Sequence, residues 1–357
     1  MVRNVTCLRK NQEEFNITMV HSVAVIGAGA VGLSAAVNVL QALRDVKVTI
    51  IADKFDENTT SWGAGGIFRL DLDYHPKKDH ERIRDWAINS WYHYSTLAHS
   101  DQAEESGMSF VAGTLLYNVP KEEAYSVMSE LTFDFQKLSQ TQLKQLNPRV
   151  SYKYGYSFTT LLTHTGTYLK WLMKQFLYCG GSVQCRTLSS ITELQDDFDI
   201  VINCCGLNAA QLCQDKHMYP IMGHLIKVKA PWIKKFFWSE EFYMFPHNNY
   251  ILLGGIREKG NWSTVPDMAV RETILSRGKN LFPHLKHAPI IDEWVGLRPG
   301  RPSIRLELEE VKCKNKKSLP VVHNYGHAGD GITLSWDCGV EAARLVKEVL
   351  TFAKSHL

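Results

Sequence analysis

The sequence VAVIGAGAVGLSAAVNVL at residues 23–40 decides the fold of this chain. It begins with a short apolar, β-branched run that is typical of a buried strand. The G-x-G-x-x-G motif at residues 27–32 follows, and apolar residues at helical spacing continue to Leu40. A second β-branched run ends at Asp53, about 20 residues past the last glycine, where dinucleotide-binding folds place an acid that binds ribose. The stretch therefore predicts a strand–turn–helix–strand unit that binds a dinucleotide.

Each glycine of the motif has a physical role. Gly27 allows a sharp turn out of the strand, Gly29 lets a pyrophosphate approach the backbone, and Gly32 lets the helix pack close to the sheet. The helix N-terminus offers free N–H groups and the positive end of its dipole to the phosphates. The motif does not distinguish NAD from FAD, and a Gly-rich turn without a ligand is the simplest alternative.

A second glycine loop, GHAGDG at residues 326–331, precedes a helical pattern over Ile332–Ala353. A reduced isoalloxazine carries negative charge at one edge, and a helix N-terminus stabilises such charge by about 0.3–2 kcal/mol. A nicotinamide has no need of a second helix N-terminus. The loop therefore favours FAD, with an NAD-dependent dehydrogenase as the alternative.

The composition is that of a globular protein with two or three domains: 357 residues, 45% hydrophobic and 22% charged. The formal net charge of +3 favours no charged partner, and the basic run at 312–317 fits a solvated hairpin turn better than a nucleic-acid site. Polar residues and glycines interrupt residues 22–43, so no membrane-spanning helix is expected. The eight cysteines form no C-x-x-C motif and are expected to be mostly buried free thiols in a reducing compartment. His323 and His327 lack a third ligand, so no metal site is expected.

The order of predicted elements indicates a mixed α/β fold with a discontinuous Rossmann-like domain. Residues 1–20 precede the motif and are expected to be a disordered extension. The apolar strand at 198–204 is typical of a central parallel strand, so the predicted cofactor-binding domain comprises 21–70, 155–215 and 318–357. The strand-rich remainder, 71–154 and 216–317, predicts a substrate-binding domain with a mostly antiparallel sheet.

Five motifs resemble the D-amino-acid oxidase family, over nearly all of residues 20–357. They are VIGAGAVGLS at 25–34, IADKF at 51–55, LGGIREKGNW at 253–262, GLRPGRPSIRLE at 296–307 and HNYGHAGDGITLSW at 323–336. The resemblance implies non-covalent FAD and oxidation of a D-amino acid by hydride transfer from Cα. The products are a 2-oxo acid, ammonia and, because oxygen reoxidises the flavin, hydrogen peroxide. It also implies that no side chain acts as a general acid or base.

The resemblance assigns roles to individual residues. Arg298 is implied to bind the α-carboxylate together with Tyr243, and the Gly329 carbonyl to accept a hydrogen bond from the α-amine. Arg257 stands where family members that act on acidic substrates have arginine, so D-Asp, D-Glu and N-methyl-D-Asp are the expected substrates. A surface arginine is the alternative. The residues implied to bind FAD are Gly27, Ala28, Gly29, Ala30, Val31, Gly32, Asp53, Lys54, Thr60, Ser61, Gly66, Ile67, Ala328, Gly329, Asp330, Gly331, Ile332 and Thr333.

Several positions depart from the family pattern, and the first is Gly63-Ala64-Gly65-Gly66, where family members usually carry Val-Ala-Ala-Gly. Arg69 replaces a proline or polar residue, and Ala328 replaces a glycine. Trp238 falls near a second arginine of the acidic-substrate members, and Phe245 replaces a tyrosine. Three alternatives remain: an oxidase of neutral D-amino acids, a glycine or sarcosine oxidase of similar fold in which Arg257 has no role, and, because of Ala328 and the 63–70 loop, a catalytically impaired flavoprotein.

The chain ends in Ser355-His356-Leu357, which resembles the peroxisomal Ser-Lys-Leu signal. A peroxide-forming reaction fits that compartment. The sequence therefore predicts recognition by the peroxisomal import receptor, with the cytosol as the alternative location.

Overall fold

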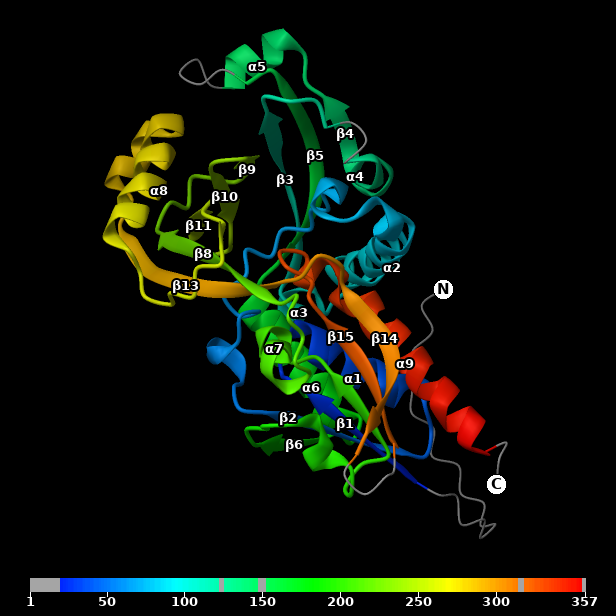
Figure 1. Cartoon of the computed structure of the whole chain (residues 1–357). Helices are drawn as coiled ribbons and strands as arrows, with labels where there is room; N and C mark the ends of the chain where they lie inside the picture. The colour runs from blue at the N-terminus through cyan, green and yellow to red at the C-terminus, as the bar shows by residue number, and fades with distance from the viewer. Residues whose placement is uncertain (1–19, 122–124, 147–151, 314–317, 355–357) are drawn as a thin grey trace.

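The computed structural model describes residues 20–121, 125–146, 152–313 and 318–354, which form two sheets with helices packed around them (Figure 1). The expected N-terminal extension, apart from Val20, lies outside the described residues. So do the end of the basic run, 314–317, and the C-terminal tripeptide.

The first sheet has six strands in the order β14-β15-β7-β1-β2-β6, and only β14 runs antiparallel to its neighbour. Both faces of β1 are buried: Val23 and Val25 enter the main core, and Ala24 and Ile26 enter a second cluster on the opposite face. This two-sided burial explains why the strand is apolar without alternation. The strands are β1 (His21–Ile26), β2 (Val46–Ala52), β6 (Ser182–Cys185), β7 (Ile200–Asn203), β14 (Arg305–Lys312) and β15 (Ser318–Tyr325).

Three helices cover the main-core face of this sheet: α1 (Ala30–Ala42), α6 (Thr165–Tyr178) and α9 (Gly331–Lys354). Helix α1 packs against both α6 and α9, so the first and last helices of the described chain lie side by side (Figure 1). The remaining α-helices are α2 (His80–Ala98), α3 (Ala103–Ser106), α4 (Ser126–Leu131), α5 (Gln140–Leu146), α7 (Ala209–Leu212) and α8 (Met268–Leu281).

The second sheet has nine strands and is mostly antiparallel, with β3 and β9 pairing in parallel. Alternate residues of β10 face opposite sides: Met244 packs in the cluster with α8, whereas Tyr243 and Phe245 enter the main core. Helix α8 begins after Asp267, whose carboxylate accepts hydrogen bonds from the backbone N–H groups of Ala269 and Val270. The strands are β3 (Met108–Tyr117), β4 (Phe133–Lys137), β5 (Tyr154–Thr163), β8 (Tyr219–Val228), β9 (Phe236–Ser239), β10 (Tyr243–Pro246), β11 (Ile251–Gly254), β12 (Glu258–Lys259) and β13 (Ile290–Gly300).

Two strands fall on the other side of the expected domain boundaries. Strand β5 pairs with β3 along its whole length and so belongs to the nine-stranded sheet, although 155–215 was expected in the cofactor-binding part. Strand β14 forms a long hairpin with β15 and joins the six-stranded sheet, although residues up to 317 were expected in the substrate-binding part. The assignment of a function to each part remains a prediction.

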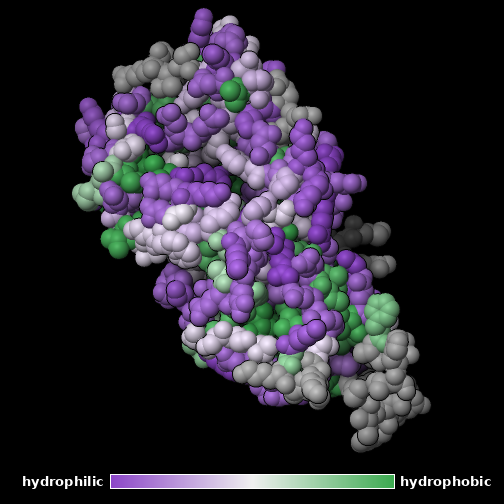
Figure 2. Space-filling model, viewed as in Figure 1, coloured by the Kyte–Doolittle hydropathy of each residue, from purple (hydrophilic) through white to green (hydrophobic). Residues whose placement is uncertain are grey.

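The cysteines are less uniformly buried than expected. Cys313 and Cys338 are buried, but Cys179 and Cys185 are exposed because they lie at the end of α6 and on the edge strand β6. Cys7 lies outside the described residues. Hydrophilic residues cover most of the face drawn in Figure 2, and no helix in the described part of the chain is long and apolar enough to span a membrane.

Candidate functional site

One cavity of about 580 Å³ runs from the carboxyl ends of β1 and β2 to the inner face of the nine-stranded sheet. Every residue predicted to bind cofactor or substrate lines it except Ala30. Ala30 instead donates its backbone N–H to Ser61 Oγ over 3.0 Å, which ties the motif to the loop after β2. Sequence segments more than 200 residues apart thus converge on one space.

The glycine motif forms one end of the cavity. Gly27 has a φ of +102°, and a Cβ there would lie 2.6 Å from the carbonyl oxygen of Cys204. A Cβ on Gly32 would lie 2.0 Å from the carbonyl oxygen of Gly27. At Gly29 the nearest atom is a side-chain atom, Ser61 Oγ, at 3.0 Å. Gly27 and Gly32 are therefore required by backbone packing, whereas Gly29 keeps the cavity wall open.

Gly29 is the N-cap residue of α1 and has no side chain to cap the helix, although Ser61 accepts the N–H of Ala30. First-turn N–H groups have no intrahelical acceptor, and Val31 and Gly32 line the cavity. Asp53 and Lys54 follow β2 as exposed residues on the same wall. This end therefore offers backbone donors to an anion and a carboxylate to hydroxyl groups.

The N-terminus of α9 faces the middle of the cavity, where Gly331, Ile332 and Thr333 line it. Ala328 has a φ of +47°, a left-handed conformation that explains why glycine is usual there. The buried Asp330 side chain lies 2.8 Å from Nε2 of His75. Burial alone would raise the pKa of Asp330, but the hydrogen bond and charge of His75, with the charges of Arg69 and Arg257, lower it.

Arg298 and Tyr243 project into the other end of the cavity from β13 and β10. The guanidinium of Arg298 packs directly against the backbone of β8 at Gly223. A side chain there would displace it, since a Cβ on Gly223 would lie 2.1 Å from Arg298 Nη1. Burial, and then the charge of Arg257, lower the pKa of Arg298, against the opposing effect of its hydrogen bond with Tyr243. Nη1 of Arg298 is buried without a hydrogen-bond partner. A buried, unsatisfied cationic donor of this kind indicates an anionic ligand.

Arg257 follows β11 and lines the same cavity. Its guanidinium lies 4.6 Å from the centre of the Tyr74 ring, and its Nη2 lies 3.1 Å from the place of a Cβ on Gly329. Arg257 is exposed rather than buried, because the cavity in front of it is open. No carboxylate among the described residues forms an ion pair with it, so its charge is available to a ligand.

Comparisons with known proteins agree with this geometry. The family model described as DAO, FAD dependent oxidoreductase, matches residues 22–345. The chain belongs to the DAO family of FAD-dependent oxidoreductases. A D-aspartate oxidase of Homo sapiens is 37% identical over 91% of this chain and 94% of its own, and a D-amino acid oxidase of Dugesia ryukyuensis is 34% identical over 93% and 99%. Glycine oxidase from Geobacillus kaustophilus shares the fold, with a TM-score of 0.74 at 18% identity over 92% of this chain and 95% of its own.

Membership of the DAO family confirms the predictions of FAD as cofactor and of the family itself, and it removes the NAD-dependent alternative. The fold-class prediction is also confirmed, because a parallel sheet and a mostly antiparallel sheet occur together. The residues present fit FAD, because two helix N-termini and the bare backbone at Gly29 line one elongated cavity. The roles of individual residues remain predictions.

Arg69 lies beside Trp238, which pairs with Tyr243 in the nine-stranded sheet. Its Nη1 donates to the Tyr125 hydroxyl over 3.0 Å and lies 3.6 Å from Asp71 Oδ2, and its guanidinium is 4.5 Å from the Trp238 ring centre. Burial would lower the pKa of Arg69, but Tyr125, Asp71 and Asp330 raise it. Arg69 is therefore a fixed cation in the cavity wall, beside Trp238.

Sequence reasoning missed several lining residues. Tyr74 follows a loop without a recognisable motif. Trp294 and Arg186 lie in segments to which no functional role was assigned from the sequence, yet all three residues line the cavity. A glycine at 63 was a usable signal for Trp294, because a Cβ there would lie 2.2 Å from the indole. His323 is bound by Glu309, and in the described part of the chain no three His, Cys, Asp or Glu residues are grouped to hold a metal ion.

Proposed function

We propose that this chain is an FAD-dependent D-aspartate oxidase that converts D-Asp, D-Glu and N-methyl-D-Asp to 2-oxo acids, ammonia and hydrogen peroxide. Its membership of the DAO family supports the oxidase chemistry. The preference for acidic substrates rests on one observation: Arg257, a cation without an ion-pair partner among the described residues, lines the same cavity as Arg298.

The proposed roles follow from the chemistry of each group. When bound, FAD supplies the hydride acceptor. The planar guanidinium of Arg298 binds the α-carboxylate in a bidentate manner, assisted by the Tyr243 hydroxyl. The Gly329 carbonyl accepts a hydrogen bond from the neutral α-amine, and Arg257 binds the side-chain carboxylate from beside Gly329. Orientation does the catalytic work, so no side chain acts as a general acid or base.

Oxygen uptake with a panel of D-amino acids tests this proposal. We expect kcat/KM for D-Asp to exceed that for D-Ala in the wild type. Arg257→Met should lower kcat/KM for D-Asp by about 10- to 100-fold, the value of one hydrogen bond to a charged group, and leave D-Ala nearly unchanged. Arg257→Lys is the matched control, because it keeps the charge and should lose less. Equal kcat/KM for D-Asp and D-Ala in the wild type would contradict the acidic preference.

An oxidase of neutral D-amino acids is the second candidate. Trp238, Tyr243 and Phe245 give the substrate end an aromatic wall, and the Tyr243 and Phe245 rings stack with centroids 4.6 Å apart. The same panel decides between the two, because a neutral-substrate enzyme prefers D-Ala or larger apolar D-amino acids and is insensitive to Arg257→Met. A protein that binds FAD but oxidises no D-amino acid would support the impaired-flavoprotein alternative. Oxidation of glycine or sarcosine in preference to D-amino acids would support the alternative of a glycine or sarcosine oxidase.

We also propose that Ser355-His356-Leu357 directs the protein to peroxisomes through the import receptor. The motif is the support, since these residues lie outside the described part of the chain. Deletion of the three residues should move a fluorescently tagged protein, with the tag at its N-terminus, to the cytosol. An unchanged location would contradict the signal.

A further inference from the structure

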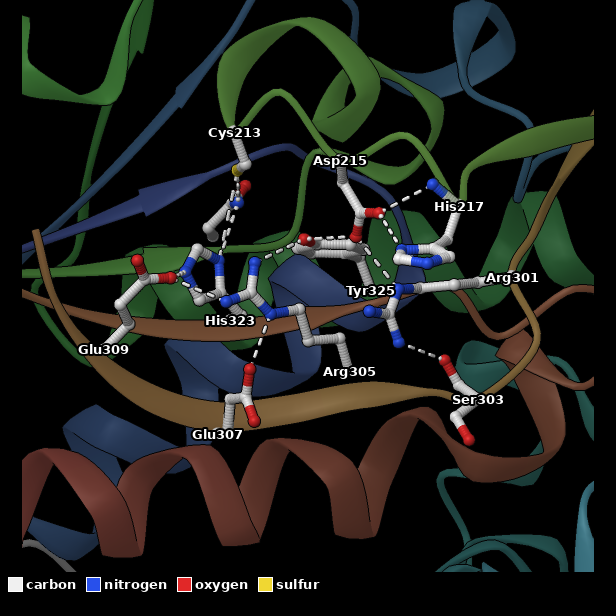
Figure 3. A network of polar contacts seen from close by, with 11 residues as sticks. Cys213, Asp215, His217, Arg301, Ser303, Arg305, Glu307, Glu309, His323 and Tyr325 are labelled. Atoms are coloured by element: carbon white, nitrogen blue, oxygen red, sulfur yellow. Dashed lines mark hydrogen bonds and ion pairs between the residues drawn. The ribbon is translucent and has the colours of Figure 1, made fainter.

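A second cluster of reactive side chains lies beyond the cavity wall, where β7, β14 and β15 meet the segment after α7. Figure 3 shows Cys213 pointing toward His323, with Glu309 on the far side of the imidazole. The Sγ of Cys213 lies 4.0 Å from His323 Nδ1, and His323 Nε2 lies 2.9 Å from Glu309 Oε2. This thiol–imidazole–carboxylate order is the one that activates cysteine nucleophiles.

The surroundings of Cys213 stabilise a thiolate. Asn203 Nδ2 donates to Sγ over 2.8 Å, and the Arg305 guanidinium, which binds Glu309, adds positive charge nearby. The interaction with Cys205, the hydrogen bond and charge of His323 and the charge of Arg305 lower the pKa of Cys213 to about 5, against the effect of burial. Cys213 is half-buried, so part of the residue is exposed to solvent.

The pKa of Cys205 is shifted in the opposite direction from that of Cys213. Burial, and then contact with Cys213, raise the pKa of the Cys205 thiol, so it keeps its proton while Cys213 is ionised. Asn203 holds the two cysteines side by side, because its Nδ2 donates to Cys213 Sγ over 2.8 Å and its Oδ1 accepts the backbone N–H of Cys205 over 3.3 Å. A low-pKa thiol beside a second cysteine is the arrangement of redox-sensing sites.

We propose that Cys213 and Cys205 are a peroxide-sensitive thiol pair that closes to a disulfide and thereby weakens cofactor binding. The proposal goes beyond the proposed oxidase function, which supplies its natural oxidant, hydrogen peroxide. Neither cysteine is among the residues proposed above to bind FAD or substrate.

The chemistry balances in two steps. The Cys213 thiolate attacks one oxygen of hydrogen peroxide, the O–O bond breaks, and the hydroxide released takes a proton to become water, leaving Cys213 as a sulfenic acid. His323 can receive the thiol proton at Nδ1 while Glu309 stabilises the resulting imidazolium. The Cys205 sulfur then attacks the sulfenic sulfur, the S–O bond breaks, and a second water leaves with the Cys205 proton. Overall, two thiols and one peroxide give one disulfide and two waters.

The pair is coupled to the cofactor cavity through the backbone. Cys205 lines the cavity, and the adjacent Cys204 donates its N–H to the Ile26 carbonyl over 2.9 Å. The carbonyl of Cys204 is the atom that excludes a side chain at Gly27. A disulfide that pulls Cys205 toward Cys213 therefore displaces the wall beneath the glycine turn.

Exposure of the FAD-loaded protein to added hydrogen peroxide, without any D-amino acid, tests the proposal. We expect mass spectrometry of a non-reducing digest to find a Cys205–Cys213 disulfide that dithiothreitol reverses. In Cys205→Ser, Cys213 should stop at the sulfenic acid and be trapped by dimedone. Cys185→Ser, at an exposed thiol, is the matched control and should form the disulfide as the wild type does.

Flavin fluorescence titration of the oxidised and reduced apoprotein measures the consequence. Oxidation should weaken FAD binding by about 5- to 150-fold, the usual range for coupled sites, and bound FAD should slow disulfide formation by reciprocity. The Cys213→Ser protein should show no change on peroxide treatment. At pH 7, iodoacetamide should label Cys213 roughly tenfold faster than Cys185.

Absence of the Cys205–Cys213 disulfide, or labelling of Cys213 no faster than Cys185, would overturn the thiol pair. Unchanged FAD affinity after full disulfide formation would overturn its coupling to the cavity. Because peroxide is added directly, a protein that oxidises no D-amino acid still gives a decisive result here. An active oxidase whose thiols do not react with peroxide would support the proposed oxidase function and overturn the thiol pair.

Discussion

The two ends of the cavity are built in different ways. At the end near α1, backbone groups make the site: glycines at 27, 29 and 32 and the N–H groups of a helix turn. At the other end, side chains of Arg69, Arg257 and Arg298 reach one space from different elements. At Gly27 and Gly32 the backbone leaves no room for an added atom, whereas a side-chain site can be changed one residue at a time. The first end should therefore be invariant in its chemistry, and the second should set which substrate is used.

The largest expected effect breaks the backbone end. Gly32→Ala places a Cβ 2.0 Å from the Gly27 carbonyl oxygen, so we expect a loss of about 1–3 kcal/mol in the free energy of unfolding and no retained FAD. Gly29→Ala meets only the rotatable Ser61 hydroxyl. It should leave the stability of the apoprotein within about 0.5 kcal/mol and weaken FAD binding alone. Denaturant unfolding and flavin titration measure both, and identical behaviour of the two variants would refute the distinction.

At the side-chain end, the largest effect is expected at Arg298. Arg298→Met should lower kcat/KM by about 100- to 1,000-fold, because a carboxylate loses a buried bidentate partner worth roughly 3–4 kcal/mol. The protein should retain FAD, since Arg298 is not among the residues proposed to bind it. Arg298→Lys keeps the charge without the planar fork and should recover only part of the rate. A rate within a few-fold of wild type in Arg298→Met would exclude the proposed clamp.

Asp330 provides a further test of the side-chain end, because its negative charge interacts with the positive charges of Arg69 and Arg257. The raised pKa of His75 gives stabilisation that is complete below about pH 6.5 and is lost as pH rises through the higher folded value. The lowered pKa of Asp330 gives stabilisation that is complete above about pH 4 and is lost on acidification.

Asp330→Asn should therefore cost on the order of 2 kcal/mol between about pH 4 and 6.5 and less at higher pH. It should also lower the KM for D-Asp severalfold, since Arg69 and Arg257 lose a competing anion. Unfolding curves at several pH values and steady-state kinetics measure the two effects. A stability cost that does not change with pH would argue against the ion pair.

The smallest expected effect is at Ala328. Its left-handed backbone is unfavourable for alanine, so Ala328→Gly should stabilise the protein by about 1 kcal/mol, less the extra entropy that glycine gains in the unfolded chain. Thermal unfolding of the FAD-loaded protein measures the change. A lower melting temperature would show that the loop holds alanine without strain.

Much of the backbone end was predictable, because its requirements are local. The spacing of Gly27, Gly32 and Asp53 depends on one βαβ unit, and that unit is written in consecutive residues. The side-chain end was predictable only through the family resemblance, since Arg257 and Arg298 become neighbours through pairing of β8 with β11 and β13. The positions of Arg69 and Tyr74 depend on packing against Trp238 and Arg257, which no periodicity encodes. The boundaries at β5 and β14 were misplaced for the same reason, because strand partners are chosen by contacts distant in sequence.

The adjacency of the first and last helices has a consequence for biosynthesis. The turn at residues 27–32 leaves the ribosome early, but the wall it needs at 326–333 is made only near the end of translation. A nascent chain therefore has half a binding site for most of its synthesis. Both walls of the cavity are therefore present only after residues 326–333 have been made.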